Sequence, residues 1–108
     1  YEVNVVKLSD FLKDQKIDFL KIDIEGGERK VFFEILPYLR NVDNLFLEYH
    51  SFIHETQYLS EILHYLQELN FRYYIEDDFK VKRPLTSDYV SLQQDMKLNI
   101  WAKRIDAK

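Results

Sequence analysis

Two kinds of hydrophobic periodicity alternate along this chain of 108 residues. Runs rich in β-branched and aromatic residues predict strands, and segments with apolar residues every three or four positions predict helices. The predicted strands are 3–7, 18–24, 44–50, 71–76 and 98–103. The predicted helices are 9–15, a second from Glu28 that ends or kinks at Pro37, and a third from about Thr56 to a left-handed cap at Asn70. The polar segment 77–97 is predicted to be an insertion.

The order of these elements predicts the fold class. Strands that alternate with helices are typical of an α/β protein with a mainly parallel sheet and helices on its faces. The last two strands have no predicted helix between them. We therefore expect them to form a C-terminal antiparallel hairpin.

Composition narrows the classes of partner and compartment. A net charge of −4 argues against nucleic acid as a partner, because phosphate binding requires clustered Lys and Arg. No run reaches the length of a membrane helix, and no signal peptide is visible. The absence of cysteine excludes disulfides and thiolate metal sites and fits a cytoplasmic protein. The chain opens on Tyr1 with a strand-like pattern, so we interpret it as part of something longer.

The two glycines of the chain, at 26–27, follow a pair of carboxylates at the end of a predicted strand. Side chains alternate along a strand, so Asp23 and Glu25 share one face, and Glu48 and His50 share a face of the next strand. If those strands are parallel neighbours, their carboxyl ends lie together, where open α/β sheets bind ligands. We therefore predict that the four side chains converge on one pocket, with the glycines allowing a sharp turn beside it.

Purely structural roles are open for each of these residues. Lys21 lies in mid-strand and needs a carboxylate partner if it is buried, which Glu48 could supply. Asp23 and Glu25 could cap the following helix, because anions are favoured at helix N-termini. His50 could be a surface histidine. The convergence of four ionisable groups at two strand ends favours the functional interpretation.

Two metal sites are not favoured by the spacing. A calcium-binding loop that starts at Asp23 would need glycine at its sixth position, where Glu28 stands. His50 and His54 could bind zinc only if both lay on a helix, and His50 is predicted at a strand end. No metal ligand is therefore predicted.

The stretches LKIDIEGGER, VFFEILPYL and NLFLEYH resemble the FkbM-type methyltransferases, which use S-adenosylmethionine. The motif lies at residues 21–26, and Glu28 takes the expected place after it. Gly27 stands where alanine is usual, and Ser9 replaces an aspartate of the preceding segment. The resemblance extends over residues 3 to about 69.

This resemblance implies a Rossmann-like methyltransferase sheet, of which residues 1–108 would be the C-terminal part, the second half of a single domain. The half that binds S-adenosylmethionine would precede Tyr1. The implied reaction is methylation of a hydroxyl on a small-molecule or glycan acceptor. The family topology also implies one sheet in which the 98–103 strand is antiparallel and lies between the strands at 44–49 and 71–76.

Site roles follow as hypotheses. Asp23 would orient the acceptor or contact the cofactor, His50 or Glu25 would be the general base, and Glu48 would support the acceptor site. Two other classes stay open: a magnesium-dependent phosphoryl or phosphodiester enzyme, and a non-catalytic module that works by association. The edge of the 19–24 strand is predicted to be exposed, and to be covered by 3–7 or by pairing with another copy.

Overall fold

The computed structural model describes residues 16–23, 28–78, 83, 85 and 93–105. Its elements, in chain order, are β1 (Ile17–Asp23), α2 (Glu28–Ile35), the 3-10 helix η1 (Leu36–Asn41), β2 (Val42–Phe52), α3 (Leu59–Glu68), β3 (Phe71–Asp77) and β4 (Gln94–Arg104). The predicted strand at 3–7 and helix at 9–15 lie outside the described residues.

The four strands form one sheet in the order β1-β2-β4-β3. The strands β1 and β2 are parallel, and β4 is antiparallel to both β2 and β3. The prediction that the last strand is antiparallel and lies between β2 and β3 is confirmed, as is the antiparallel pairing of the last two strands.

The prediction of a mainly parallel, Rossmann-like methyltransferase sheet is wrong. One of the three strand pairs is parallel and two are antiparallel, so this is a small mixed sheet with two short α-helices. The cause is the position of β4. By lying between β2 and β3, it replaces one parallel contact with two antiparallel ones.

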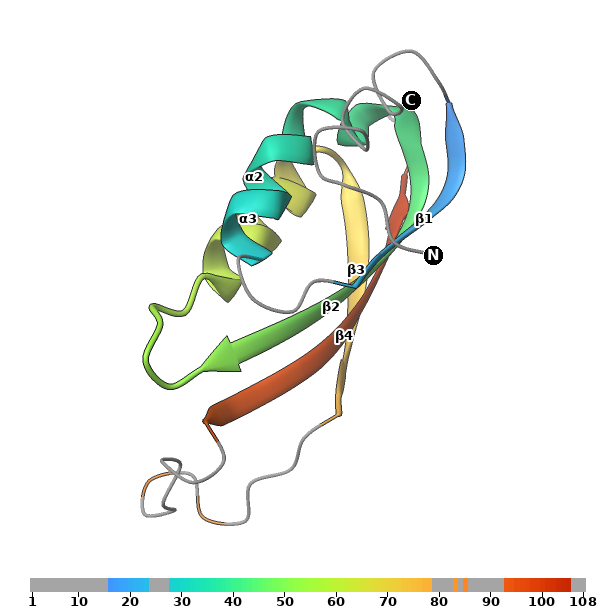
Figure 1. Cartoon of the computed structure of the whole chain (residues 1–108). Helices are drawn as coiled ribbons and strands as arrows, with labels where there is room; N and C mark the ends of the chain where they lie inside the picture. Colours follow the sequence, from blue (N-terminus) through green and yellow to red (C-terminus); the bar gives the residue numbers. More distant parts are fainter. Residues whose placement is uncertain (1–15, 24–27, 79–82, 84, 86–92, 106–108) are drawn as a thin grey trace.

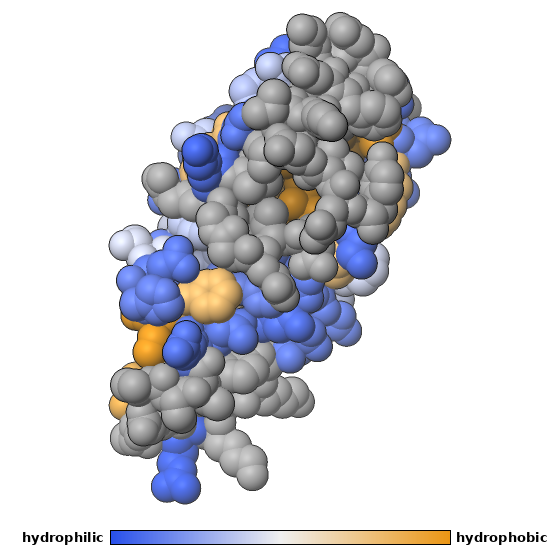
Figure 2. Space-filling view, viewed as in Figure 1, coloured by the Kyte–Doolittle hydropathy of each residue, from blue (hydrophilic) through white to orange (hydrophobic). Residues whose placement is uncertain are grey.

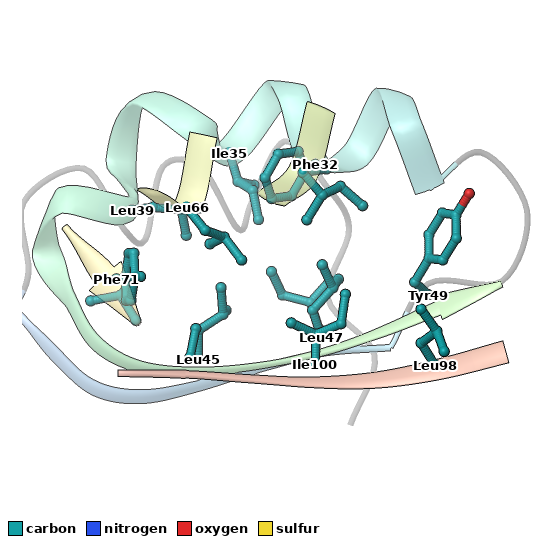
Figure 3. Packing of buried hydrophobic residues seen from close by; sticks show 14 of the residues in the cluster. Phe32, Ile35, Leu39, Leu45, Leu47, Tyr49, Leu66, Phe71, Leu98 and Ile100 are labelled. Carbon is teal, nitrogen blue, oxygen red and sulfur yellow. The ribbon is translucent and has the colours of Figure 1, made fainter. Parts of the chain in front are cut away.

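Both α-helices lie on the same face of the sheet (Figures 1 and 3). The core fills the space between them and the strands. Its largest fully buried side chains are Tyr49, Phe32, Ile35, Leu39, Leu45, Leu47, Ile62, Leu66, Ile100 and Val42. Alternation along β2 and β4 sends every second side chain into this layer.

The intervening side chains of each strand lie on the opposite face, which no helix of the described chain covers (Figure 1). We call this the open face. Apart from the buried His50, its side chains are exposed or half-buried, in contrast to the fully buried core, and most of them are aromatic or charged. Its described side chains are Phe19, Lys21, Asn44, Phe46, Glu48, His50, Arg72, Tyr74, Glu76, Lys97, Asn99, Trp101 and Lys103.

Single residues determine where two of the helices end, as predicted. The α-helix α2 ends at Ile35, and Pro37 occupies the first turn of the 3-10 helix that continues it. Proline has no N–H to donate to an α-helical ladder, so the helix cannot pass through this position unchanged. Asn70 has φ of 66° and ends the turn after α3, in the left-handed conformation that asparagine tolerates.

Arg104, the last residue of β4, contacts three backbone carbonyls from other segments and the ring of Phe71. Its guanidinium donates hydrogen bonds to the carbonyl oxygens of Val42 (3.1 Å), Leu69 (2.6 Å) and Leu39. The guanidinium carbon also lies 4.6 Å from the centre of the Phe71 ring. The fork of donors therefore holds the ends of η1 and α3 against the starts of β2 and β3.

We expect the Arg104→Lys substitution to lower the free energy of unfolding by about 2 kcal/mol, because one ammonium cannot serve three carbonyls that point from different segments. Urea denaturation followed by circular dichroism measures the change. The same loss of the guanidinium at an exposed position, Arg72→Lys, should change stability by less than about 0.5 kcal/mol. Equal effects of the two substitutions would contradict the structural role given to Arg104.

A candidate strand-end site

The two central carboxylates of the predicted site meet in the sheet register. Asp23, the last residue of β1, pairs with Glu48 of β2. The parallel, neighbouring arrangement on which the predicted convergence depends is therefore present. The Asp23 side chain and all of Glu25 and the glycine pair lie outside the described part of the structure, so their roles stay predictions.

Glu48 lies on the open face and pairs with a residue that the sequence pattern did not suggest. Its Oε1 is 3.3 Å from Nζ of Lys97, and the same ammonium is 3.3 Å from Oδ2 of Asp78. Hydrogen bonds from Lys97 to Asp78 and to Glu48 raise the pKa of this lysine above its usual 10.5. The stabilisation is therefore complete below pH 10.5 and is lost as pH rises through the raised pKa.

The proposed structural pair of Lys21 and Glu48 is wrong. Lys21 is exposed, so it needs no buried partner, and its Nζ lies 5.7 Å from the centre of the Phe46 ring. The register explains this, since Lys21 pairs with Phe46 whereas Glu48 lies one row further along β2. The carboxylate of Glu48 is thus held by β4 and not by β1.

His50 is buried, with 6% of its surface exposed, which rules out the interpretation as a surface histidine. Its Nδ1 lies 3.0 Å from Oε1 of Gln94, and its ring stacks at 9° to that of Phe52. The amide oxygen of Gln94 can only accept a hydrogen bond, so Nδ1 donates to it, and in the neutral imidazole Nε2 then carries the lone pair.

Among the described residues, the Nε2 atom of His50 has no hydrogen-bond partner, and it lies 3.9 Å from Oε2 of Glu48. Two acceptors that face each other at this distance suit a donor between them. A buried acceptor without a partner carries a free-energy cost that a bound hydroxyl would remove. A hydroxyl that reached Nε2 of the neutral imidazole could donate its proton to this acceptor.

A second polar cluster lies on the helical side of the same end of β2. The Gln57 side chain donates to Oγ of Ser51 at 3.0 Å and to Oδ2 of Asp95 at 3.4 Å. Within the part of the chain that the structure describes, Oδ1 of Asp95 is buried without a hydrogen-bond partner. The Tyr49 hydroxyl, labelled in Figure 3, accepts the backbone N–H of Tyr58 at 3.2 Å. Burial raises the pKa of the Tyr49 phenol above its usual 10.0, so the neutral phenol is the form that the fold holds at neutral pH.

Sequence reasoning missed the residues of β4 that complete the site, namely Gln94 and Lys97, and the neighbouring Asp78. All three fell in the predicted insertion. One signal could have found the longer strand: Met96, Leu98, Ile100 and Ala102 alternate with polar or exposed residues, which extends the period of two back into the insertion. Nothing in the pattern identifies Gln94 as the partner of His50.

The surface around these strands is largely polar where seen in Figure 2, with hydrophilic residues gathered across the middle of the molecule. A hollow of about 460 Å³ lies elsewhere on the open face, beside the aromatic side chains of Phe19, Tyr74 and Trp101. The described side chains therefore do not by themselves form the pocket predicted at the strand ends.

Only part of an S-adenosylmethionine site fits the described residues. The carboxylate of Glu48, in register with Asp23, suits a positively charged sulfonium. The hollow on the open face is removed from that carboxylate, so contacts to the adenosine would have to come from other residues. Among the described residues no group of three or more His, Asp and Glu could hold a metal ion.

None of the helices in the described ranges has the length and apolar character needed to cross a bilayer.

Neither the curated proteins nor the solved structures contain a match to this chain. A family model described as the methyltransferase FkbM domain matches residues 1–73, which is more than half of the chain and includes β1, β2 and α3. The chain therefore belongs to the FkbM methyltransferase domain family.

Proposed function

We propose that this chain is the carboxyl-terminal part of an S-adenosylmethionine-dependent methyltransferase that methylates a hydroxyl on a sugar or another natural product. The family match supports the reaction class. The observation that carries the site assignment is the buried Nε2 of His50, which lies beside the Glu48 carboxylate and has no hydrogen-bond partner among the described residues.

The acceptor hydroxyl would donate its proton toward Nε2 of His50. An alcohol is a weak nucleophile while it keeps its proton, so a base within hydrogen-bond reach contributes about 10²–10⁴-fold. Gln94 holds the imidazole in the required tautomer through Nδ1, and Phe52 fixes the plane of the ring. The bound cofactor supplies the methyl group on a sulfonium, and the rest of the acceleration comes from positioning.

Glu48 would orient the acceptor and stabilise the imidazolium that forms when His50 takes the proton. Its other carboxylate oxygen is held by Lys97, which fixes the carboxylate in place. Asp23, its register partner, would contact the acceptor or the sulfonium. Glu25 is the second candidate for the base and lies outside the described residues.

The proposal predicts where cofactor affinity resides. We expect the full-length protein, which includes the proposed part before Tyr1, to bind S-adenosylmethionine. The 108-residue chain should bind it at least about 10²-fold more weakly, and isothermal calorimetry measures both affinities. Radiolabelled methyl groups should pass to an alcohol acceptor without added metal. Absence of cofactor heat in the full-length protein, or turnover of a phosphate ester that requires Mg²⁺, would contradict the proposal.

A further inference from the structure

Two neighbouring rows of described residues on the open face carry cations and aromatic rings but no carboxylate. The pairing registers define each row across all four strands. The first row contains Phe19, Asn44, Lys103 and Arg72. The second row contains Lys21, Phe46, Trp101 and Tyr74. We call these two rows the cationic–aromatic patch, and carboxylates return in the next row, at Glu48 and Glu76.

The protein does not neutralise the three cations of this patch. Lys21, Lys103 and Arg72 are exposed, and none of them forms an ion pair with another residue in the described ranges. Lys103 and Arg72 lie directly opposite each other in the antiparallel pair of β3 and β4. Like charges at such positions repel each other and destabilise a sheet. An anion bound between them would remove this repulsion, so the patch is complementary to negative charge.

The aromatic rings of the patch are exposed to water around the hollow of about 460 Å³. Tyr74 is 68% exposed, Phe19 is 53% exposed and Trp101 is 45% exposed. The Trp101 ring is held from one side, because its centre lies 4.4 Å from that of Phe46. The face of an aromatic ring is negative and attracts the C–H groups of a ligand ring that stacks on it. The hollow therefore suits a ligand with rings, and the two cations that also line it suit acidic groups on the same ligand.

The dimensions of the patch indicate the length of this ligand. Phe19 belongs to β1 and Tyr74 to β3, which are the two outer strands of the sheet order. Strands that are about 4.8 Å apart place these two rings about 14 Å from each other, which is farther than one ligand ring can span. The two rows together are only about 7 Å wide. The patch therefore fits a short chain of rings that lies across the strands.

Asn44 favours a sugar chain over a strand of nucleic acid. Its side-chain N–H donates to the carbonyl oxygen of Asp18 at 2.9 Å, which leaves the amide oxygen to accept a hydrogen bond at the hollow. A sugar hydroxyl can donate to this oxygen, whereas a phosphodiester has no proton to donate. The net charge of −4 also disfavours a nucleic acid, which would extend beyond the three cations.

We propose that the cationic–aromatic patch binds a short acidic oligosaccharide. Its rings stack on the exposed aromatic side chains, and its carboxylates pair with Arg72 and Lys103. These charge pairs lie at the surface, so we expect a dissociation constant on the order of 0.1–1 mM. The binding site follows from the open face alone and is independent of the proposed methyl transfer.

Trp101 is the only tryptophan of the chain, so tryptophan fluorescence reports directly on the patch. Titration of the 108-residue chain with trigalacturonate, a trimer of an acidic sugar, should give a saturable change in this fluorescence. Galactotriose of the same linkage lacks the carboxylates, so it should bind at least about tenfold more weakly. The comparison measures how much of the affinity depends on charge.

Arg72→Gln should weaken the binding of trigalacturonate by about threefold or more, because it removes one of the two cations at the hollow. Arg40→Gln is the matched control, because Arg40 is also an exposed arginine but lies in η1, outside the patch, and its affinity should be unchanged. Circular dichroism verifies that both variants are folded.

Three results would overturn the proposal. The first is the absence of a saturable change at up to about 10 mM trigalacturonate. The second is equal affinity for galactotriose, or an equal loss in the two arginine variants, because the cations of the patch would then not select the ligand. The third is tighter binding of a thymidine trinucleotide than of trigalacturonate, which would assign the patch to nucleic acid.

Discussion

Replacement of His50 by alanine in the full-length enzyme should lower turnover by about 10²-fold or more and leave the affinity for S-adenosylmethionine nearly unchanged. The reason is the position of Nε2, which is buried and faces the Glu48 carboxylate across 3.9 Å, where the neutral imidazole can accept a proton. The substitution removes an interaction that is made only in the transition state, as the proton of the acceptor hydroxyl moves to His50. Turnover therefore falls, while cofactor binding is unchanged. Steady-state methyl transfer and cofactor calorimetry measure the two quantities separately.

Two companion variants separate chemistry from folding. Asp23→Asn keeps size and hydrogen bonding but removes the charge, so the fold should survive while turnover falls. Glu48→Gln removes one partner of the Lys97 ion pair and should lower both stability and turnover, because the carboxylate serves both. Full methyl-transfer rates in both His50→Ala and Asp23→Asn would show that the strand-end residues are scaffolding.

The fold could be predicted from the sequence wherever one local signal was decisive. The strong periodicity of α3, the proline in η1 and the asparagine with positive φ each appeared where the pattern indicated. The parallel character of the sheet could not be predicted by alternation alone. A strand pattern has no direction, and the insertion of β4 between β2 and β3 changes the pairings without changing the order of elements.

The register that brings Asp23 beside Glu48 could be predicted from the sequence, whereas the partners of Glu48 and His50 could not. Glu48 and His50 share a face because side chains alternate along β2, and Asp23 meets Glu48 because the two strands are parallel neighbours. Their partners come from β4, about 45 residues away in sequence, through the register of an antiparallel pair. No short-range pattern encodes that register, so Lys21 was paired with Glu48 where the fold uses Lys97.

The core beneath the site contains the β2 side chains that alternate with the site residues and point toward the helices. Leu47 lies between Phe46 and Glu48 in sequence but is fully buried against the helices, and it pairs with Ile22 of β1 and Ile100 of β4 (Figure 3). Both of its pairing neighbours are therefore aliphatic, and it belongs to the buried core cluster. Truncation would leave a cavity that strands on both sides prevent from collapsing.

We expect Leu47→Ala to lower the free energy of unfolding by about 3 kcal/mol, from lost burial and the cavity that remains. A domain of this length has about 5–15 kcal/mol in total, so the variant should unfold at a much lower urea concentration with an unchanged slope. Leu85→Ala is the matched control, because the same atoms are removed from a side chain that is 98% exposed, and its effect should stay within about 0.5 kcal/mol. A loss below about 1 kcal/mol for Leu47→Ala would mean that β2 does not pack under the helices as described, and the faces assigned to Glu48 and His50 would then be wrong as well.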